Sequence, residues 1–129
     1  MFLKKFKIKN YRCIKDATID FNKGVNILIG ENNSGKTAVL DALRVCLSYG
    51  KQQREIWVSS NNFHLDKNDP EAETGDIEFH LFFEIEDEVE AGIYNDFLSV
   101  GEDDTQELQI HFRYYIEERN GIKKVRYSV

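Results

Sequence analysis

The sequence predicts an α/β fold in which one helix packs on a mixed sheet and an antiparallel β-rich arm follows. Three observations support this prediction. Several stretches alternate apolar and polar residues with the period of a strand, one stretch near residue 40 changes to the helical period, and Asn120-Gly121 is a strong β-hairpin signal. The length of 129 residues allows one compact unit.

The composition is that of an ordinary globular domain. Hydrophobic residues make up 41%, aromatic residues 12% and charged residues 31%, which excludes collagen-like and disordered classes. No apolar run approaches the ~18 residues that span a membrane. Cys13 and Cys46 have no second Cys or His at metal-ligand spacing, so we expect reduced thiols, no zinc site and a cytoplasmic location.

Charge is distributed unevenly along the chain. The formal net charge is -6, but residues 1–51 hold ten Lys or Arg against four Asp or Glu, and residues 52–129 hold seven against nineteen. An acidic chain is a poor binder of nucleic acid on bulk charge. Its first 51 residues are nevertheless able to form a basic face.

Three strands are predicted before residue 30. Residues 2–9 place Phe2, Phe6 and Ile8 on one side and three lysines on the other, and residues 17–21 repeat this alternation. Residues 25–29 are almost continuously apolar, which predicts a strand that is covered on both faces.

One amphipathic helix is predicted from Gly35, with Gly50 as its C-terminal stop. Residues 51–75 are polar and show no sustained period, so we expect a loop. The expected helix stripe consists of Val39, Ala42, Leu43, Cys46 and Leu47, and the expected loop anchors are Trp57, Val58 and Phe63.

The rest of the chain reads as strands with a short helix between them. Residues 77–85 alternate as a half-buried strand, Asp87 and Glu90 have capping-box spacing, and an amphipathic helix is expected to continue to Leu98. Residues 108–116 form the next strand. The Asn-Gly turn predicts the cross-strand pairs Arg119 with Ile122, Glu117 with Lys124, Ile116 with Val125, Tyr115 with Arg126, Tyr114 with Tyr127 and Phe112 with Val129. The last strand still alternates at Val129, so we expect a longer protein.

Residues 30–37 read Gly-Glu-Asn-Asn-Ser-Gly-Lys-Thr and match the P-loop pattern G-x-x-x-x-G-K-[ST]. The match follows an apolar run and opens the predicted helix, which is the context that the motif requires. Inward backbone N–H groups and a helix N-terminus attract a polyanionic triphosphate. We expect Lys36 to reach the β- and γ-phosphates and the Thr37 hydroxyl to ligate Mg²⁺. ATP and Mg²⁺ are the predicted ligands.

Other polar residues carry weaker signals. Arg12, in the connection between the first two strands, is balanced between a phosphate contact and a solvated turn arginine. The acidic stretches 84–90 and 102–107 are expected to be solvated faces. Residues 81–88 superficially resemble a Walker B strand, but strict alternation favours a half-exposed antiparallel strand. The three histidines share no spacing and are expected to be structural; they are His64, His80 and His111.

The first 50 residues resemble the N-terminal lobe of the ABC-type ATPases of the SMC/RecF group. The segments that carry the resemblance are FKIKNYRCIKDATIDF and GVNILIGENNSGKTAVLDAL, in which an Asn-aromatic-Arg element precedes the P-loop. Within that group, GENNSGKT and the later NNFHL, followed by an acidic strand, look most like OLD-family ATP-dependent endonucleases. The resemblance is specific over residues 6–47 and faint over residues 48–129.

The resemblance implies a P-loop NTPase fold of the ABC/SMC-like type, a homodimer, DNA as a partner of the full-length protein and no membrane association. It implies that Arg12 contacts phosphate and that residues 32–38 wrap the nucleotide. No catalytic residue is predicted. The expected ATP-binding set is Arg12, Gly30, Asn32, Asn33, Ser34, Gly35, Lys36, Thr37 and Ala38, with Thr37 as the magnesium ligand.

Members of this group also carry a signature sequence, a Walker B acid pair and a switch histidine, and OLD proteins add a Toprim nuclease; none is visible in this sequence. We therefore expect this chain to be the ATPase part of a larger ATP-dependent nuclease. Within it, residues 1–50 hold the strands, the P-loop and the helix, residues 51–75 form a loop, and residues 76–129 form the β-rich arm. We expect this part to be inactive alone. The alternatives are an SMC/RecF-type repair ATPase without nuclease, a small kinase or GTPase, and a non-catalytic P-loop module. The two strands before the P-loop favour the ABC-type lobe over a kinase or GTPase.

Overall fold

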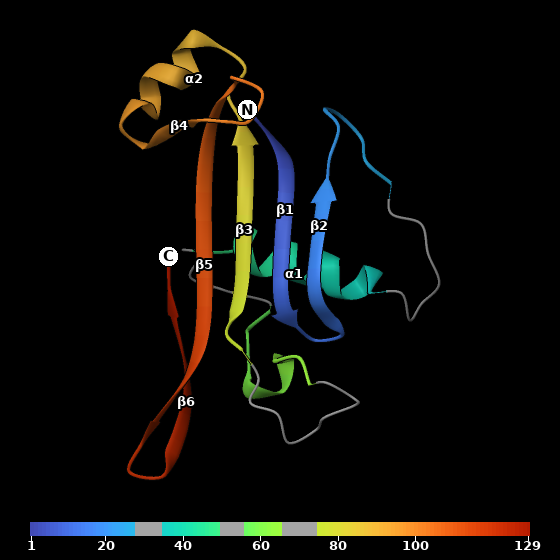
Figure 1. Ribbon diagram of the computed structural model, residues 1–129, viewed down its shortest axis with the longest axis vertical. Helices are drawn as coiled ribbons and strands as arrows, with labels where there is room; N and C mark the ends of the chain where they lie inside the picture. Colours follow the sequence, from blue (N-terminus) through green and yellow to red (C-terminus); the bar gives the residue numbers. More distant parts are fainter. Residues whose placement is uncertain (28–34, 50–55, 66–74) are drawn as a thin grey trace.

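The computed structural model describes residues 1–27, 35–49, 56–65 and 75–129. Its strands form one sheet in the order β2, β1, β3, β5, β4, with β6 also paired to β5 (Figure 1). The strands are β1 (Phe2–Tyr11), β2 (Ile14–Asp20), β3 (Ile77–Glu84), β4 (Leu98–Val100), β5 (Gln106–Arg119) and β6 (Ile122–Ser128). The helices are α1 (Lys36–Leu47), α2 (Glu88–Ile93) and the short 3-10 helices η1 (Ser60–Asn62) and η2 (Asn95–Phe97).

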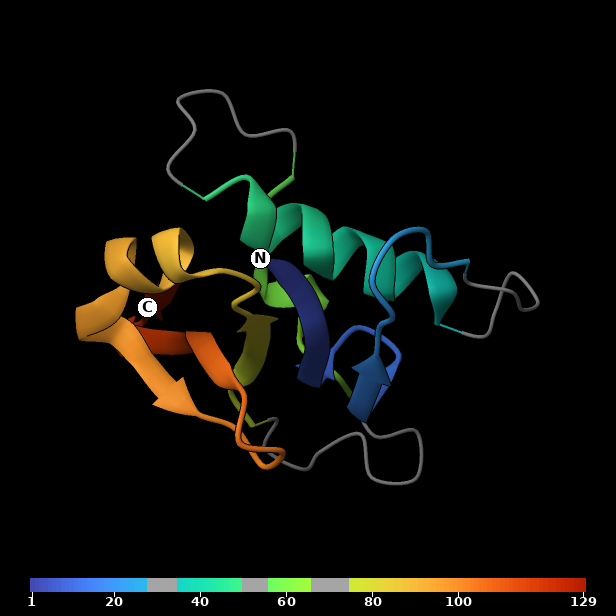
Figure 2. The ribbon, with the colours of Figure 1, turned by 90° about the horizontal axis from the view of Figure 1, so that it is seen from above.

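The core lies between one face of the sheet and α1, which crosses behind the strands (Figures 1 and 2). Alternation explains which side chains face it: Phe6 and Ile8 of β1 and Phe79 and Leu81 of β3 are buried. The α/β class is therefore confirmed. Every described strand pair is antiparallel, so the parallel pairing of a mixed sheet is not found among the described residues.

Helix α1 buries a stripe close to the expected one. Val39, Ala42 and Cys46 are buried as predicted, and Ala38 and Val45 join them. Leu47 is 60% exposed, because at 3.6 residues per turn it lies roughly 140° around the helix from Ala42. Among the described residues, no helix combines the length and the apolar character needed to cross a membrane.

The predicted strand over residues 25–29 is wrong for its first three residues. Residues 25–27 are not in a strand, and Val25 and Ile27 are 90% and 78% exposed. An apolar run is covered only where a neighbouring element packs on it, and no described strand pairs with these residues. Positions 28 and 29, like the predicted stop at Gly50, lie outside the described residues.

The predicted loop contains an ordered segment. Residues 60–62 form η1, Phe63 is buried, and Phe63 makes an isolated antiparallel bridge with Tyr11 of β1. Val58 is partly buried as expected, whereas Trp57 is 64% exposed, so it is not a buried anchor. Residues 51–55 and 66–74 lie outside the described residues.

The region after β3 differs from the predicted amphipathic helix. Asp87 caps α2 as predicted, since its Oδ1 accepts a hydrogen bond from the Glu90 N–H at 2.8 Å. However, Val89 and Ile93 are 73% and 68% exposed. The helix has only six residues and lies at the end of the sheet, beyond the face that α1 covers (Figure 1). Leu98 begins β4 instead of ending the helix.

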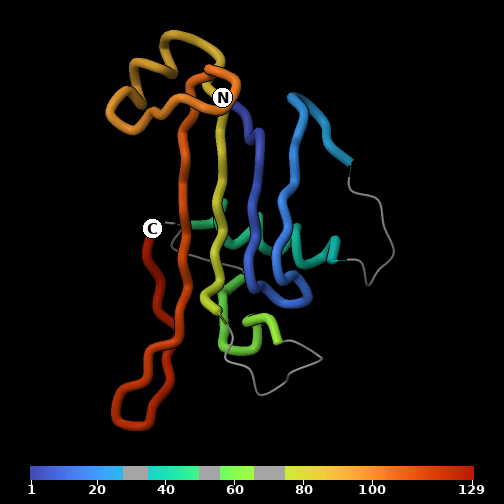
Figure 3. Tube along the Cα trace, viewed as in Figure 1, coloured from blue at the N-terminus to red at the C-terminus, as the bar shows by residue number. Residues whose placement is uncertain are grey.

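The C-terminal hairpin has the predicted register. Five predicted pairs, from Arg119 with Ile122 to Tyr114 with Tyr127, are observed, and Asn120 and Gly121 have the positive φ values of 52° and 77° that a tight hairpin turn requires. The pair of Phe112 with Val129 is not formed, because β6 ends at Ser128. The end of the hairpin extends beyond the other strands (Figure 3).

Candidate functional site

The described part of the P-loop motif is the start of α1. Gly35 is the N-cap, with φ 88° and ψ 1°, and its carbonyl accepts the Val39 N–H at 3.0 Å. A Cβ at this position would meet Cys13 Sγ at an ordinary 3.5 Å, so the left-handed backbone, not lack of space, requires glycine. Gly30, Asn32, Asn33 and Ser34 lie outside the described residues.

Three site residues form the first turn of α1. Lys36 is half-buried, Thr37 is exposed, and Ala38 packs in the core at 4% exposure. No acidic residue lies in this turn, and among the described residues the N-cap position makes no side-chain capping hydrogen bond. The first N–H groups of a helix have no intrahelical partner and carry partial positive charge. This end of α1 therefore suits an anion.

Arg12 projects from the β1–β2 turn onto α1. Its guanidinium forms an ion pair with Asp41, which also contacts Arg44 at 3.4 Å. The Arg12 and Asp41 side chains are 31% and 16% exposed. The interpretation of Arg12 as a freely solvated turn residue is therefore wrong. Asp41 follows Thr37 by about one helical turn, so Arg12 lies against the same helix that begins with the motif.

Sequence reasoning missed two residues beside this turn. The Asn62 carbonyl accepts the Arg12 N–H at 2.6 Å, and His64 Nδ1 lies 2.7 Å from the Arg12 carbonyl oxygen. These contacts join parts of the chain that are about fifty residues apart. Both residues belong to the NNFHL string that carries part of the family resemblance, but nothing in that string predicts a contact with Arg12.

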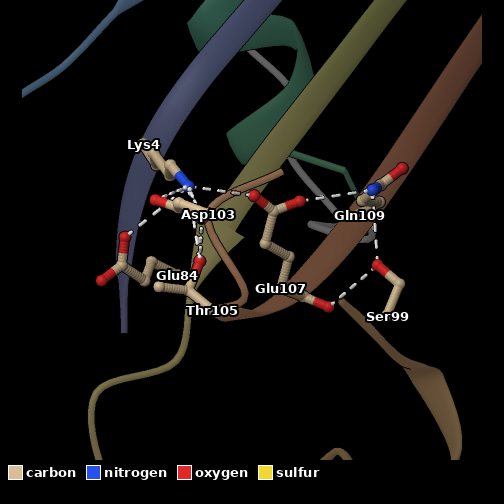
Figure 4. A network of polar contacts seen from close by, with 7 residues as sticks. All are labelled: Lys4, Glu84, Ser99, Asp103, Thr105, Glu107 and Gln109. Carbon is tan, nitrogen blue, oxygen red and sulfur yellow. Dashed lines mark hydrogen bonds and ion pairs between the residues drawn. The ribbon is translucent and has the colours of Figure 1, made fainter. Parts of the chain in front are cut away.

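A second polar cluster surrounds Lys4 at the other end of β1 (Figure 4). The β1–β3 register shifts between Leu3 and Lys5, which makes Lys4 the irregular residue. Its Nζ donates to Asp103 at 3.0 Å and to Glu107 at 3.1 Å. Glu107 is 6% exposed, so the prediction that residues 102–107 are all solvated is wrong there.

The carboxylates of this cluster share the single positive charge of Lys4. The Thr105 hydroxyl, and then Lys4, lower the pKa of Asp103 to about 2. The hydrogen bond from Lys4 to Asp103 raises the lysine pKa. We therefore assign this cluster a structural role, because the hydrogen bonds of Lys4 join β1 to the loop after β4 and to β5.

His80 and His111 lie side by side on the paired strands β3 and β5, with ring centroids 5.1 Å apart, whereas His64 lies in the segment after η1. His80 Nε2 lies 3.1 Å from Gln109 Oε1, and His111 Nε2 lies 3.2 Å from Glu78 Oε1. Burial lowers the His80 pKa. Across residues 1–27, 35–49, 56–65 and 75–129, no group of three or more His, Cys, Asp or Glu side chains is arranged to hold a metal ion.

β3 does not have the surroundings of a Walker B strand. It is antiparallel to β1 on one side and to β5 on the other. Its side chains alternate, with Phe79 and Leu81 buried and His80 and Phe82 half-buried on the other face. This agrees with the half-exposed antiparallel strand that alternation favoured.

Curated relatives match the N-terminal part of the chain. The DNA double-strand break repair Rad50 ATPase of Pyrococcus abyssi is 39% identical over 63 residues, which are 49% of this chain and 7% of that protein. The DNA replication and repair protein RecF of Acetivibrio thermocellus is 41% identical over 54 residues, 42% of this chain and 14% of RecF. The chain thus spans a small fraction of the length of these relatives.

A solved structure matches almost the whole chain. It comes from work on ATP-driven dimerization and DNA-stimulated activation of SMC ATPases. The likeness covers 99% of this chain and 69% of that one, with a TM-score of 0.60 and 24% identity, and it shows a shared fold. The AAA ATPase domain family matches residues 1–127. With the family matched over nearly its full length and with this SMC-like P-loop α/β fold, the chain belongs to the AAA ATPase domain family.

Proposed function

We propose that this chain binds Mg-ATP at residues 30–38. The observation that carries the proposal is the start of α1, where Gly35 takes a left-handed backbone and Lys36 and Thr37 follow in the first helical turn. The turn has no acidic residue, and the N–H groups at a helix N-terminus suit phosphate oxygens. The exposed Thr37 hydroxyl is a hard oxygen ligand of the kind that Mg²⁺ prefers.

Each residue of the set has a distinct task in this proposal. Gly30, Asn32, Asn33 and Ser34 contribute backbone N–H groups, and Gly35 turns the chain into the helix. Lys36 places an ammonium against the phosphates, and Thr37 holds Mg²⁺, which supplies positive charge that offsets the phosphates when bound. Ala38 is buried, so it fixes the first turn of α1 on the sheet. Arg12 supplies a second cation from the β1–β2 turn.

For the full-length protein, we infer an SMC/RecF-type ATPase that acts on DNA as a homodimer in the cytoplasm. Support comes from the names of the relatives, which are DNA repair proteins, and from the SMC ATPase structure, whose study concerns ATP-driven dimerization. We propose that these 129 residues form one ATPase part. Residues 1–50 contribute the strands, the P-loop and the helix, residues 51–75 a loop, and residues 76–129 the β-rich arm. GENNSGKT and NNFHL support the finer proposal of an OLD-like ATP-dependent nuclease.

Calorimetric titration of Mg-ATP into the 129-residue chain tests the binding site. Charge-assisted contacts are the strong class of hydrogen bonds, so Lys36→Ala is expected to weaken binding at least about tenfold. Lys15→Ala is the matched control, because Lys15 is an exposed lysine of β2 outside the site. Equal affinity of the wild type and Lys36→Ala would refute the proposed site. Absence of any ATP binding by the wild type would instead favour a non-catalytic module with a vestigial motif.

A further inference from the structure

The turn between β1 and β2 is strained at two positions. Asn10 has φ 56° and Arg12 has φ 51°, which is the left-handed region that residues other than glycine rarely adopt. Asparagine tolerates this region better than arginine does, because its short amide hydrogen-bonds locally. Such strain persists only where the surrounding structure holds it, and it concentrates at functional sites. Contacts from the surrounding structure therefore hold Arg12 in this conformation.

The segment 62–64, at the end of η1, binds the backbone on both sides of this turn. The Arg12 N–H donates to the Asn62 carbonyl at 2.6 Å, and the His64 N–H donates to the Asn10 carbonyl at 2.9 Å. His64 Nδ1 lies 2.7 Å from the Arg12 carbonyl oxygen. A carbonyl oxygen only accepts, so the Nδ1 atom carries the proton and donates. Both backbone polar groups of Arg12 thus bind to Asn62 and His64.

This segment is itself fixed. Asn62 Oδ1 accepts the Ser59 N–H at 2.8 Å, and the Asn62 N–H donates to the Ser59 carbonyl at 3.0 Å, which closes η1. Phe63, between the two contact residues, is 5% exposed in the core and pairs with Tyr11. The segment is therefore fixed by its own hydrogen bonds and packing, and it holds the Arg12 backbone in place.

The guanidinium of Arg12 makes two contacts of its own. With its backbone held, Arg12 extends over the Tyr11 ring, 5.1 Å from the ring centroid, and reaches Asp41 on α1. We propose that His64 and Asn62 are positioning residues for Arg12 and act through its backbone to aim the guanidinium at the phosphates of the bound nucleotide. This inference rests on the proposed Mg-ATP site.

A double-mutant cycle on Mg-ATP affinity tests it. The hydrogen bond to Arg12 is removed by His64→Ala, which is expected to weaken binding about three- to tenfold. In the Arg12→Ala background the same change is expected to have no effect. His64→Asn is expected to restore affinity, because its amide nitrogen can donate from near the position of Nδ1. His64→Gln displaces the donor and is expected to bind as His64→Ala does. Asn61→Ala, at an exposed neighbouring position, is the control.

Three outcomes would overturn the inference: an unchanged affinity in His64→Ala, an equal loss in the Arg12→Ala background, or no recovery in His64→Asn. Thermal melting of each variant checks that it folds, and the Asn and Gln variants decide the question if His64→Ala does not. If Lys36→Ala loses affinity while the His64 series stays flat, the Mg-ATP site stands and only the positioning role fails. A wild type that does not bind Mg-ATP contradicts both.

Discussion

The Tyr11 side chain shows how one residue combines a favourable and an unfavourable burial. Its ring is fully buried and packs edge-on against Phe79, with ring centroids 5.1 Å apart. Its hydroxyl is buried too, and no hydrogen-bond partner is found for it among the described residues. Burial raises the Tyr11 pKa. The ring therefore stabilises the fold, while the hydroxyl carries a desolvation cost.

Tyr11→Phe is expected to raise the free energy of unfolding by about 1 kcal/mol, since it keeps the ring and removes an unpaired buried polar group. Urea denaturation of both proteins measures the change. Tyr115→Phe is the control, because Tyr115 is only half-buried and little change is expected there. A loss of stability in Tyr11→Phe would show that the hydroxyl has a favourable partner.

The predictability of the site differs between residues for a physical reason. The sequence predicted that a helix opens at Gly35, and the structure confirms this, because the motif and the helical period are local patterns; phosphate binding by Lys36 and Thr37 stays a prediction. The contacts of Asn62 and His64 with Arg12 were not predicted, because they depend on the tertiary packing of a segment that shows no period. The structure also shows that Arg12 pairs with Asp41, which no local pattern predicted.

Among the secondary structure elements, the irregular part of β1 fastens the loop after β4 to the sheet. Lys4 bridges from β1 to Asp103 in that loop and to Glu107 at the start of β5. The fit is close, since a Cβ on Gly101 would lie 2.3 Å from Glu107 Oε1. A buried carboxylate that loses its cation is costly, so the attachment of this loop depends on Lys4.

Lys4→Met keeps the apolar stem and removes the charge, which leaves Glu107 buried without its cation. The free energy of unfolding is expected to fall by on the order of 3 kcal/mol. Lys9→Met, on the exposed part of the same strand, is the control and is expected to change little. Combining Lys4→Met with Glu107→Gln should recover part of the loss. If chemical denaturation gave Lys4→Met and Lys9→Met the same free energy of unfolding, the structural role of Lys4 would be contradicted.

Some helices and strands could be predicted from the sequence, and others could not. The β5–β6 register was predicted because the Asn-Gly turn fixes it locally. The strand expected at residues 25–29 was wrong over residues 25–27, and so was the apolar face of α2, because burial requires a neighbouring surface that a pattern does not reveal. β4 was missed because its three residues follow a helical stretch and gain strand character only by pairing with β5.

At the scale of the whole molecule, the two halves of the chain share one sheet. β3 pairs with β1 on one side and β5 on the other, so the β-rich arm (residues 76–129) joins the N-terminal strands instead of forming a separate layer. α1 covers one face of this sheet (Figure 2). The alternation of each strand was visible in the sequence, whereas the strand order was not, because alternation identifies a strand's faces but not its neighbours. The start of α1 and the turn that holds Arg12 therefore belong to the same helix-on-sheet unit.

NMR titration of the uniformly ¹⁵N-labelled chain shows, residue by residue, whether the N-terminus of α1 binds the phosphates of ATP. With Mg-ATP, the backbone amide signals of Gly35, Lys36, Thr37 and Ala38 are expected to shift, with little change at the distant Lys4 cluster. AMP, which lacks the β- and γ-phosphates, should produce much smaller shifts at equal concentration. Unchanged signals at residues 35–38 under saturating Mg-ATP, or equal shifts with AMP, would contradict the account.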